Sequence, residues 1–196
     1  MNSNWFKPTK EQVSAARGRS VPDVIAPGLK VLFCGINPGL YTAAVSHHFA
    51  RPGNRFWPAL YQAGFTPRQF SPFEEEELLK YGYGIVNIVG HATARADELT
   101  KEELARGGAA LEEKIRVFKP GYSAVMGLGA YRTAFGRPKA QPGLQTERLA
   151  GVSYAWVLPN PSGLNAGYQI GELVGMLKEL KAAVDKECRS TDFKAD

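Results

Sequence analysis

The sequence predicts an α/β protein, a three-layer α/β/α sandwich with a mostly parallel central sheet. Short, almost continuously apolar segments alternate along the chain with segments whose apolar residues recur at helical spacing. Strands that are apolar on both faces are typical of a parallel sheet that helices cover on both sides. A length of 196 residues, of which 44% are hydrophobic, suits one domain with one well-filled core.

The individual elements follow from apolar runs, helical periodicity and capping residues. The predicted strands are 30–34, 84–89, 122–126 and 154–158. The predicted helices are 54–63, 72–80, 101–119, 131–135 and 170–184. Ser71 with Glu74, and Thr100 with Glu103, form capping boxes, so the acidic run 74–77 is interpreted as part of a helix start. The Pro/Gly-rich segment between 135 and 154 is interpreted as a solvated loop.

Composition limits the location and the partners of the protein. We predict a polar arm at 1–20 with a short helix within 8–16, a single domain at 21–187, and a loose tail at 188–196. The two cysteines, Cys34 and Cys188, support neither a disulfide framework nor a cysteine metal site. Without an export signal or a long apolar run, we expect a soluble cytoplasmic protein with no membrane contact. The net charge of +5 suits a nucleic acid partner but is equally typical of an ordinary basic protein.

Two motifs lie just past predicted strands and place an amide side chain at each strand exit. The first is GINPG at 35–39, which contains Asn37, and the second is NPSGLN at 160–165, which begins with Asn160. Either motif alone is compatible with a simple turn, because Gly, Asn and Pro are common turn residues. The carboxyl ends of parallel strands meet at one edge of the sheet, so the pair predicts a single small-molecule site.

These two motifs, together with HFARPGNRFW at 48–57, resemble the mismatch-specific uracil-DNA glycosylase family between residues 21 and 184. Both family motifs, Gly-Ile-Asn-Pro-Gly and Asn-Pro-Ser-Gly-Leu, are present unchanged. The resemblance implies a uracil-DNA glycosylase-like fold and a monofunctional enzyme that starts base excision repair. It would hydrolyse the N-glycosidic bond of uracil mispaired with guanine in DNA, and the family also allows ethenocytosine or thymine as the target base.

The resemblance also implies roles for individual residues around the first motif. Asn37 would orient the water that attacks the sugar, and Phe49 would stack on the extruded base. Backbone N–H groups near Ile36 and Gly39 would stabilise the departing uracil. Further candidates for the pocket wall are Thr42 and Asn87. Asp97 is the best carboxylate candidate to assist the water or the sugar cation, because an amide is a poor base. The alternative is that Asp97 is only a helix-entry or surface aspartate.

The second motif is implied to contact both the base and the duplex. Asn160 stands where more active uracil-excising relatives have a histidine, so we expect slow turnover. The resemblance assigns DNA contacts to Ser162, Gly163, Leu164 and Asn165, with Leu164 filling the gap that the base leaves. Many relatives have an arginine just beyond, where this chain has Ala166, which makes the preference for guanine opposite the target less certain.

The same reasoning predicts duplex DNA with a mispaired or damaged base as the partner of a monomeric enzyme that needs no cofactor and no metal. His47 and His48 are adjacent and lack a third ligand at suitable spacing. The Gly-Leu-Gly at 127–129 is not a full dinucleotide fingerprint, which disfavours a nucleotide- or flavin-binding protein. No lysine lies in either motif, so no lyase step is expected. The main alternative is a non-catalytic module of the same fold that binds damaged DNA.

Overall fold

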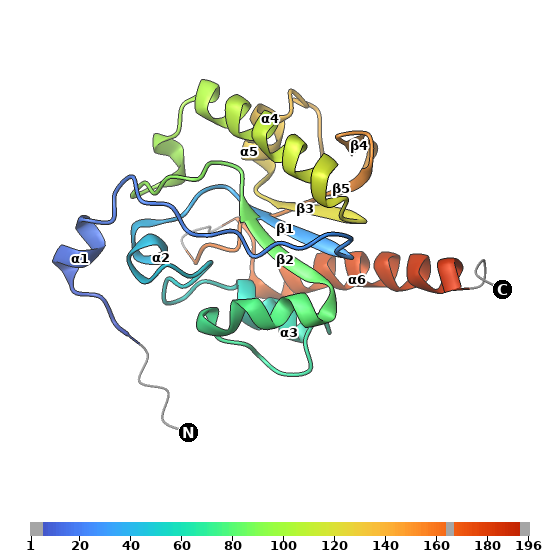
Figure 1. Ribbon diagram of the computed structural model, residues 1–196, viewed down its shortest axis with the longest axis horizontal. Helices are drawn as coiled ribbons and strands as arrows, with labels where there is room; N and C mark the ends of the chain where they lie inside the picture. Colours follow the sequence, from blue (N-terminus) through green and yellow to red (C-terminus); the bar gives the residue numbers. More distant parts are fainter. Residues whose placement is uncertain (1–5, 164–166, 193–196) are drawn as a thin grey trace.

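The computed structural model describes residues 6–163 and 167–192 and confirms the predicted α/β/α class (Figure 1). Its sheet has five strands in the order β2-β1-β3-β5-β4. The strands are β1 (Val31–Gly35), β2 (Tyr83–Asn87), β3 (Tyr122–Met126), β4 (Gly143–Leu149) and β5 (Ser153–Leu158). All pairs are parallel except β4 with β5, which is antiparallel. The sheet is therefore mostly parallel, as the apolar strands predict.

The helices alternate with the strands along the chain. They are α1 (Lys10–Ser14), α2 (Leu40–Val45), α3 (Phe56–Gln62), η1 (Pro72–Tyr81), η2 (Ala96–Glu98), α4 (Lys101–Phe118), α5 (Leu128–Ala134) and α6 (Ile170–Asp192), where η denotes a 3₁₀ helix. Both predicted capping boxes are present, at Ser71 with Glu74 and at Thr100 with Glu103. The helix predicted at 72–80 forms, with 3₁₀ geometry. No helix in the described ranges has the length and hydrophobicity to cross a membrane.

Helices cover both faces of the sheet and create two hydrophobic cores (Figure 1). On one face, α3 and α6 bury side chains such as Leu60 and Leu177 against Phe33 of β1. On the other face, α4 and α5 pack against Leu32 and Cys34, the two neighbours of Phe33. Successive strand residues thus enter opposite cores, which explains why the strands are apolar without alternation.

The strand β4 was not predicted, and the interpretation of 135–154 as a loop was wrong for this part. Its central residues are polar and mostly exposed, because β4 lies at the edge of the sheet and pairs only with β5 among the described strands. An edge strand needs little apolar surface, so hydrophobicity does not reveal it. The described part of the predicted arm forms α1, and Ala16 packs with Val21, Ala43 and Ala92.

Candidate active site

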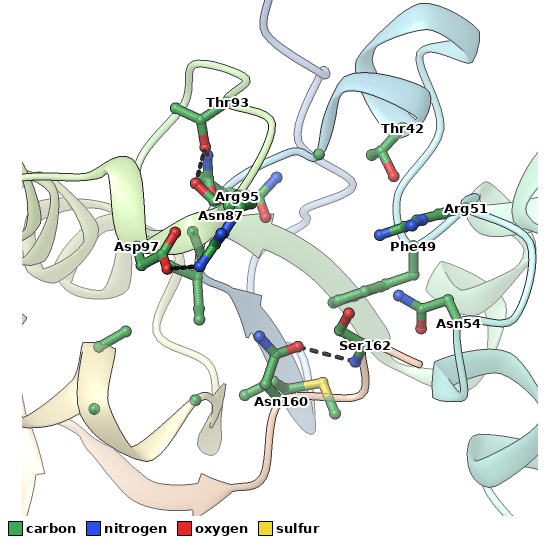
Figure 2. Close-up of a pocket in the computed structure, with 18 of the residues that line it drawn as sticks. Thr42, Phe49, Arg51, Asn54, Asn87, Thr93, Arg95, Asp97, Asn160 and Ser162 are labelled. Atoms are coloured by element: carbon green, nitrogen blue, oxygen red, sulfur yellow. Dashed lines mark hydrogen bonds and ion pairs between the residues drawn. The ribbon is translucent and has the colours of Figure 1, made fainter. Parts of the chain in front are cut away.

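A cleft of about 560 Å³ opens at the carboxyl ends of the parallel strands (Figure 2). Each of the four parallel strands contributes to its wall: Asn37 follows β1, Asn87 ends β2, Met126 ends β3 and Asn160 follows β5. The two motifs are thus on one cavity, as their positions at strand exits predict. The cleft has room for a nucleobase and part of a sugar.

The amide of Asn37 is held in one orientation by the loop that follows β2. Its Nδ2 donates to the carbonyl oxygen of His91 at 3.1 Å and to Thr93 Oγ1 at 2.8 Å. The Thr93 hydroxyl in turn donates to the carbonyl of Arg95 at 2.7 Å, so it can only accept from Asn37. Because both amide hydrogens are used, Oδ1 remains as the acceptor that Asn37 offers to a water molecule.

Gly35 allows two functional side chains to lie against the end of β1. A Cβ atom at this position would be 2.5 Å from Asn87 Oδ1 and 3.3 Å from Phe49 Cζ. A side chain at position 35 would therefore force the Asn87 amide to move and would be in tight contact with the Phe49 ring. The Asn87 amide makes no hydrogen bond with another described residue, which leaves its donor and acceptor for a ligand in the cleft.

Phe49 presents an aromatic ring to the cleft from an unusual backbone conformation. Its φ is 54°, in the left-handed region that costs a residue with a Cβ roughly 1–2 kcal/mol. The ring stacks on Phe56 of α3, with centroids 4.2 Å apart and planes 24° apart. Figure 2 shows the ring pointing into the cavity, with Ser162 and Asn160 below it. A planar base that enters the cleft would meet this ring.

The carboxylate of Asp97 lies at the rim of the same cleft. Its side chain is 62% exposed and pairs with the guanidinium of Arg95, which also lines the cleft. Figure 2 shows both side chains on the wall opposite Phe49. The structure thus brings Asp97 to the side of the cleft that holds Asn37, at a position open to solvent.

The second motif is held against the segment that follows Phe49. The N–H of Ser162 donates to Asn160 Oδ1 at 3.0 Å, which closes a tight turn (Figure 2). Arg55 then anchors this motif: its N–H donates to the carbonyl of Pro161 at 3.0 Å, and its guanidinium donates to the carbonyls of Ser162 and Tyr168. The two walls of the cleft are therefore joined through Arg55.

Most of the residues singled out from the sequence lie on this one cavity. Those that line it are Ile36, Asn37, Gly39, Thr42, Phe49, Asn87, Asp97, Asn160 and Ser162. Gly163 lies beside the cleft and packs against Gly53, while Leu164, Asn165 and Ala166 lie outside the described residues. Sequence reasoning missed Thr93 and Arg95, which follow β2 just as the first motif follows β1, and the anchor Arg55. These three residues could have been found from the sequence because each lies close to a strand exit or to a motif.

Sequence reasoning also missed a hydrogen-bonded group of titratable side chains, in which Glu75 and His48 are buried and His47 is partly exposed. His47 Nδ1 lies 2.8 Å from one carboxylate oxygen of Glu75, and His48 Nδ1 lies 2.9 Å from the other. Burial acts to raise the pKa of Glu75, but the hydrogen bonds and charge interaction with His48, together with the hydrogen bond from His47, outweigh it, so the pKa of this carboxyl lies below its usual value. Glu75 therefore belongs to the interior, whereas the run 74–77 suggested only a helix start.

The ionised Glu75 is expected to make the free energy of unfolding depend on pH. Its pKa is lowered in the folded state, so its contribution is complete above the ordinary value of 4.5 and is lost as the pH falls through the folded-state pKa. At neutral pH, Glu75→Gln should lower the free energy of unfolding by about 1.5–3 kcal/mol, because it weakens hydrogen bonds to a buried charge. The difference in the free energy of unfolding between the wild type and Glu75→Gln should narrow below pH 4.5. Denaturant titrations at several pH values test this, and a gap that widens towards acid would contradict it.

Comparison with known proteins assigns the family. A cleft with oriented amides and an aromatic ring, at the carboxyl edge of a parallel sheet, is typical of α/β proteins that bind small planar ligands. The chain belongs to the uracil DNA glycosylase superfamily, whose sequence model matches residues 22–181. This membership implies a DNA glycosylase, a hydrolase that acts on DNA.

A solved structure has the same fold. It is the solution NMR structure of a candidate uracil DNA glycosylase from Methanosarcina acetivorans. The TM-score is 0.56 at 17% sequence identity, and the match covers 84% of this chain and 98% of the other. At this level of identity the likeness shows the shared fold. In the described part of the chain, no group of three or more histidine, cysteine or acidic side chains is arranged to hold a metal ion.

Proposed function

We propose that the protein is a monofunctional, mismatch-specific uracil-DNA glycosylase, which removes uracil opposite guanine from duplex DNA and leaves an abasic site. The observation that carries this proposal is the single cleft that combines Asn37, Asn87 and Phe49. A stacking ring, a free amide and an oriented amide oxygen are the groups needed to hold a pyrimidine and direct a water at its sugar. The enzyme would act as a monomer, in the cytoplasm, without a metal or cofactor.

Base selection begins with extrusion of the target nucleotide from the helix. Stacking on an aromatic ring contributes about 1–3 kcal/mol, which is comparable to the few kcal/mol that extrusion of a mispaired base costs. Phe49 would supply this stacking, and the Asn87 amide would bind the polar edge of the base. A well-paired base costs more to extrude, so the balance favours mismatches. Ser162, Gly163, Leu164 and Asn165 would contact the duplex that the base has left.

The hydrolytic step needs a positioned water and a stabilised leaving group. Asn37 Oδ1 would accept a hydrogen bond from the water, whose oxygen forms a bond with the anomeric carbon as the bond to the base nitrogen breaks. The bonding electrons leave with uracil, and backbone N–H groups near Ile36 and Gly39 would stabilise the resulting anion. Asp97 would accept the proton that the attacking water loses, because the amide cannot take it.

The identity of residue 160 bears on the rate and range of substrates. A neutral amide at Asn160 stabilises a developing uracil anion less than a histidine would, so the chemical step is expected to be slow. A pocket that depends little on ionisation also suits ethenocytosine and thymine opposite guanine. These bases are therefore included among the proposed substrates.

The decisive experiment measures base release by the wild-type protein, followed by alkaline cleavage at abasic sites. The substrates are duplexes with uracil opposite guanine, uracil opposite adenine and thymine opposite guanine, together with single-stranded uracil DNA. We expect the fastest cleavage for uracil opposite guanine. Binding of this duplex without any cleavage would instead support the non-catalytic module, and equal rates on all uracil substrates would remove the mismatch specificity.

A further inference from the structure

A hydrogen-bonded group of three side chains includes the residue before the stacking ring and has no part in the mechanism above. The Glu75 side chain is 7% exposed and the His48 side chain 1% exposed. One carboxylate oxygen of Glu75 accepts from His47 Nδ1 at 2.8 Å. The other oxygen accepts from the His48 backbone N–H at 2.8 Å and from His48 Nδ1 at 2.9 Å. A buried carboxylate thus holds the residue that precedes Phe49.

His48 is held at its ring and at both of its backbone groups. Glu75 accepts from the ring and from the backbone N–H, and the carbonyl of His48 accepts from Trp57 Nε1 at 3.2 Å. His48 Nε2 is buried without a partner among the described residues, so the ring is fixed through its other nitrogen. The ionised Glu75 can only accept, so His48 Nδ1 carries the hydrogen of the bond between them.

The constraint on His48 passes directly to Phe49. Phe49 has the left-handed backbone conformation described above, with φ of 54°, and a residue with a Cβ keeps it only where its surroundings enforce it. The stacking on Phe56 holds the ring, and the bonded His48 holds the peptide that leads into it. Without the bonds to Glu75, residues 48 and 49 can relax to a common conformation that moves the ring.

We propose that Glu75 is a positioning residue that, through His48, holds Phe49 in the orientation in which it stacks on the extruded base. This inference rests on the proposed function and deepens it. Glu75 is not among the residues that line the cleft, whereas His48 and Phe49 are, so Glu75 acts on the base only through them. The acidic residue is thus part of base recognition, although it does not touch the base.

The first test compares two isosteric variants in single-turnover excision of uracil opposite guanine. Glu75→Gln keeps the shape but places an NH₂ group opposite an N–H or Nδ1–H donor, which breaks at least one of the bonds to residue 47 or 48. Glu76→Gln, at the exposed neighbouring position, changes the same charge and serves as control. We expect a loss of about 10–100-fold for Glu75→Gln, as for a misplaced binding group, and less than about 2-fold for Glu76→Gln. Equal rates for the two variants would overturn the proposal.

A double-mutant cycle separates positioning from a general loss of stability. If Glu75 acts through the ring, Glu75→Gln has no further effect on excision once Phe49→Ala has removed the ring. If Glu75 only stabilises the fold, Glu75→Gln costs nothing while the protein is folded, and if Glu75 acts on excision independently of the ring, the two losses multiply. Rates are measured at a temperature at which circular dichroism shows every variant to be folded. Multiplying losses would overturn the proposal.

Further variants and NMR keep the inference testable if a Glu75 variant does not fold or if no activity is found. His48→Asn retains a donor towards Glu75 and should keep at least about 5-fold more excision than His48→Ala, by the partial rescue expected of a positioning contact. In ¹⁵N spectra, the Trp57 indole N–H and the His48 Nδ1–H should shift in Glu75→Gln and stay in place in Glu76→Gln. Unshifted resonances would overturn the inference. If these resonances shift in Glu75→Gln while the wild-type protein releases no base, the link between Glu75 and His48 is present and the proposed function is wrong.

Discussion

Replacement of Asn37 by alanine is expected to lower single-turnover excision of uracil opposite guanine by about 10²–10⁴-fold, with little change in affinity for the duplex. The amide oxygen is the atom that Asn37 offers to the attacking water, because both amide hydrogens donate to the His91 carbonyl and to Thr93 Oγ1. Alanine removes this acceptor and leaves the base-binding groups in place. The rate is measured by base release, and the affinity by titration of a labelled duplex.

The network around Asn37 provides a graded comparison. Thr93→Ala removes only one of the two acceptors that orient the amide, so it should cost less than Asn37→Ala, about 10-fold. Gln145→Ala removes an amide from the edge strand β4, outside the cleft, and should leave the rate unchanged. Full excision by Asn37→Ala would refute the assignment of the water-orienting role to the first motif.

The fold was predictable because the apolar residues in the sequence mark the strand faces that are buried. Phe33 faces one core and its neighbours Leu32 and Cys34 face the other, so β1 is apolar at every position and its parallel, central place follows. The strand β4 could not be predicted in this way, because exposed polar residues are equally compatible with an edge strand and with a solvated loop.

The site was predictable where function lies at strand exits and less so where it depends on loop conformation. Asn37 and Asn160 follow apolar strands, and topology alone brings them to one cavity. Glu75 belongs to an acidic run in which Glu74 does cap the helix start. Nothing local in the sequence distinguishes the carboxylate that turns inward from its exposed neighbours, because its partners His47 and His48 lie in another segment.

The second large effect is expected for Gly35→Ala, which adds one methyl group beneath the cleft. Its Cβ would lie 2.5 Å from Asn87 Oδ1, so the Asn87 amide must move, and it would lie 3.3 Å from Phe49 Cζ. A displacement of about 1 Å in groups that hold a substrate can cost roughly 10²-fold in rate, and we expect a loss of that size. The free energy of unfolding should fall by no more than about 1 kcal/mol, because the clashing atom is the far end of the Asn87 side chain, which can move away. Single-turnover excision and denaturant unfolding measure the two effects.

Two further variants separate the loss of space from a general effect of a glycine replacement. Gly90→Ala, just beyond β2, places a methyl group in open space and should change neither the rate nor the stability appreciably. In Gly35→Ala combined with Asn87→Ala, the atom that the methyl group would strike is gone. Stability should then recover towards that of Asn87→Ala alone, while excision stays low because the amide that binds the base is missing. A double variant as unstable as Gly35→Ala would show that the crowding at position 35 involves Phe49 or the strand backbone instead of Asn87.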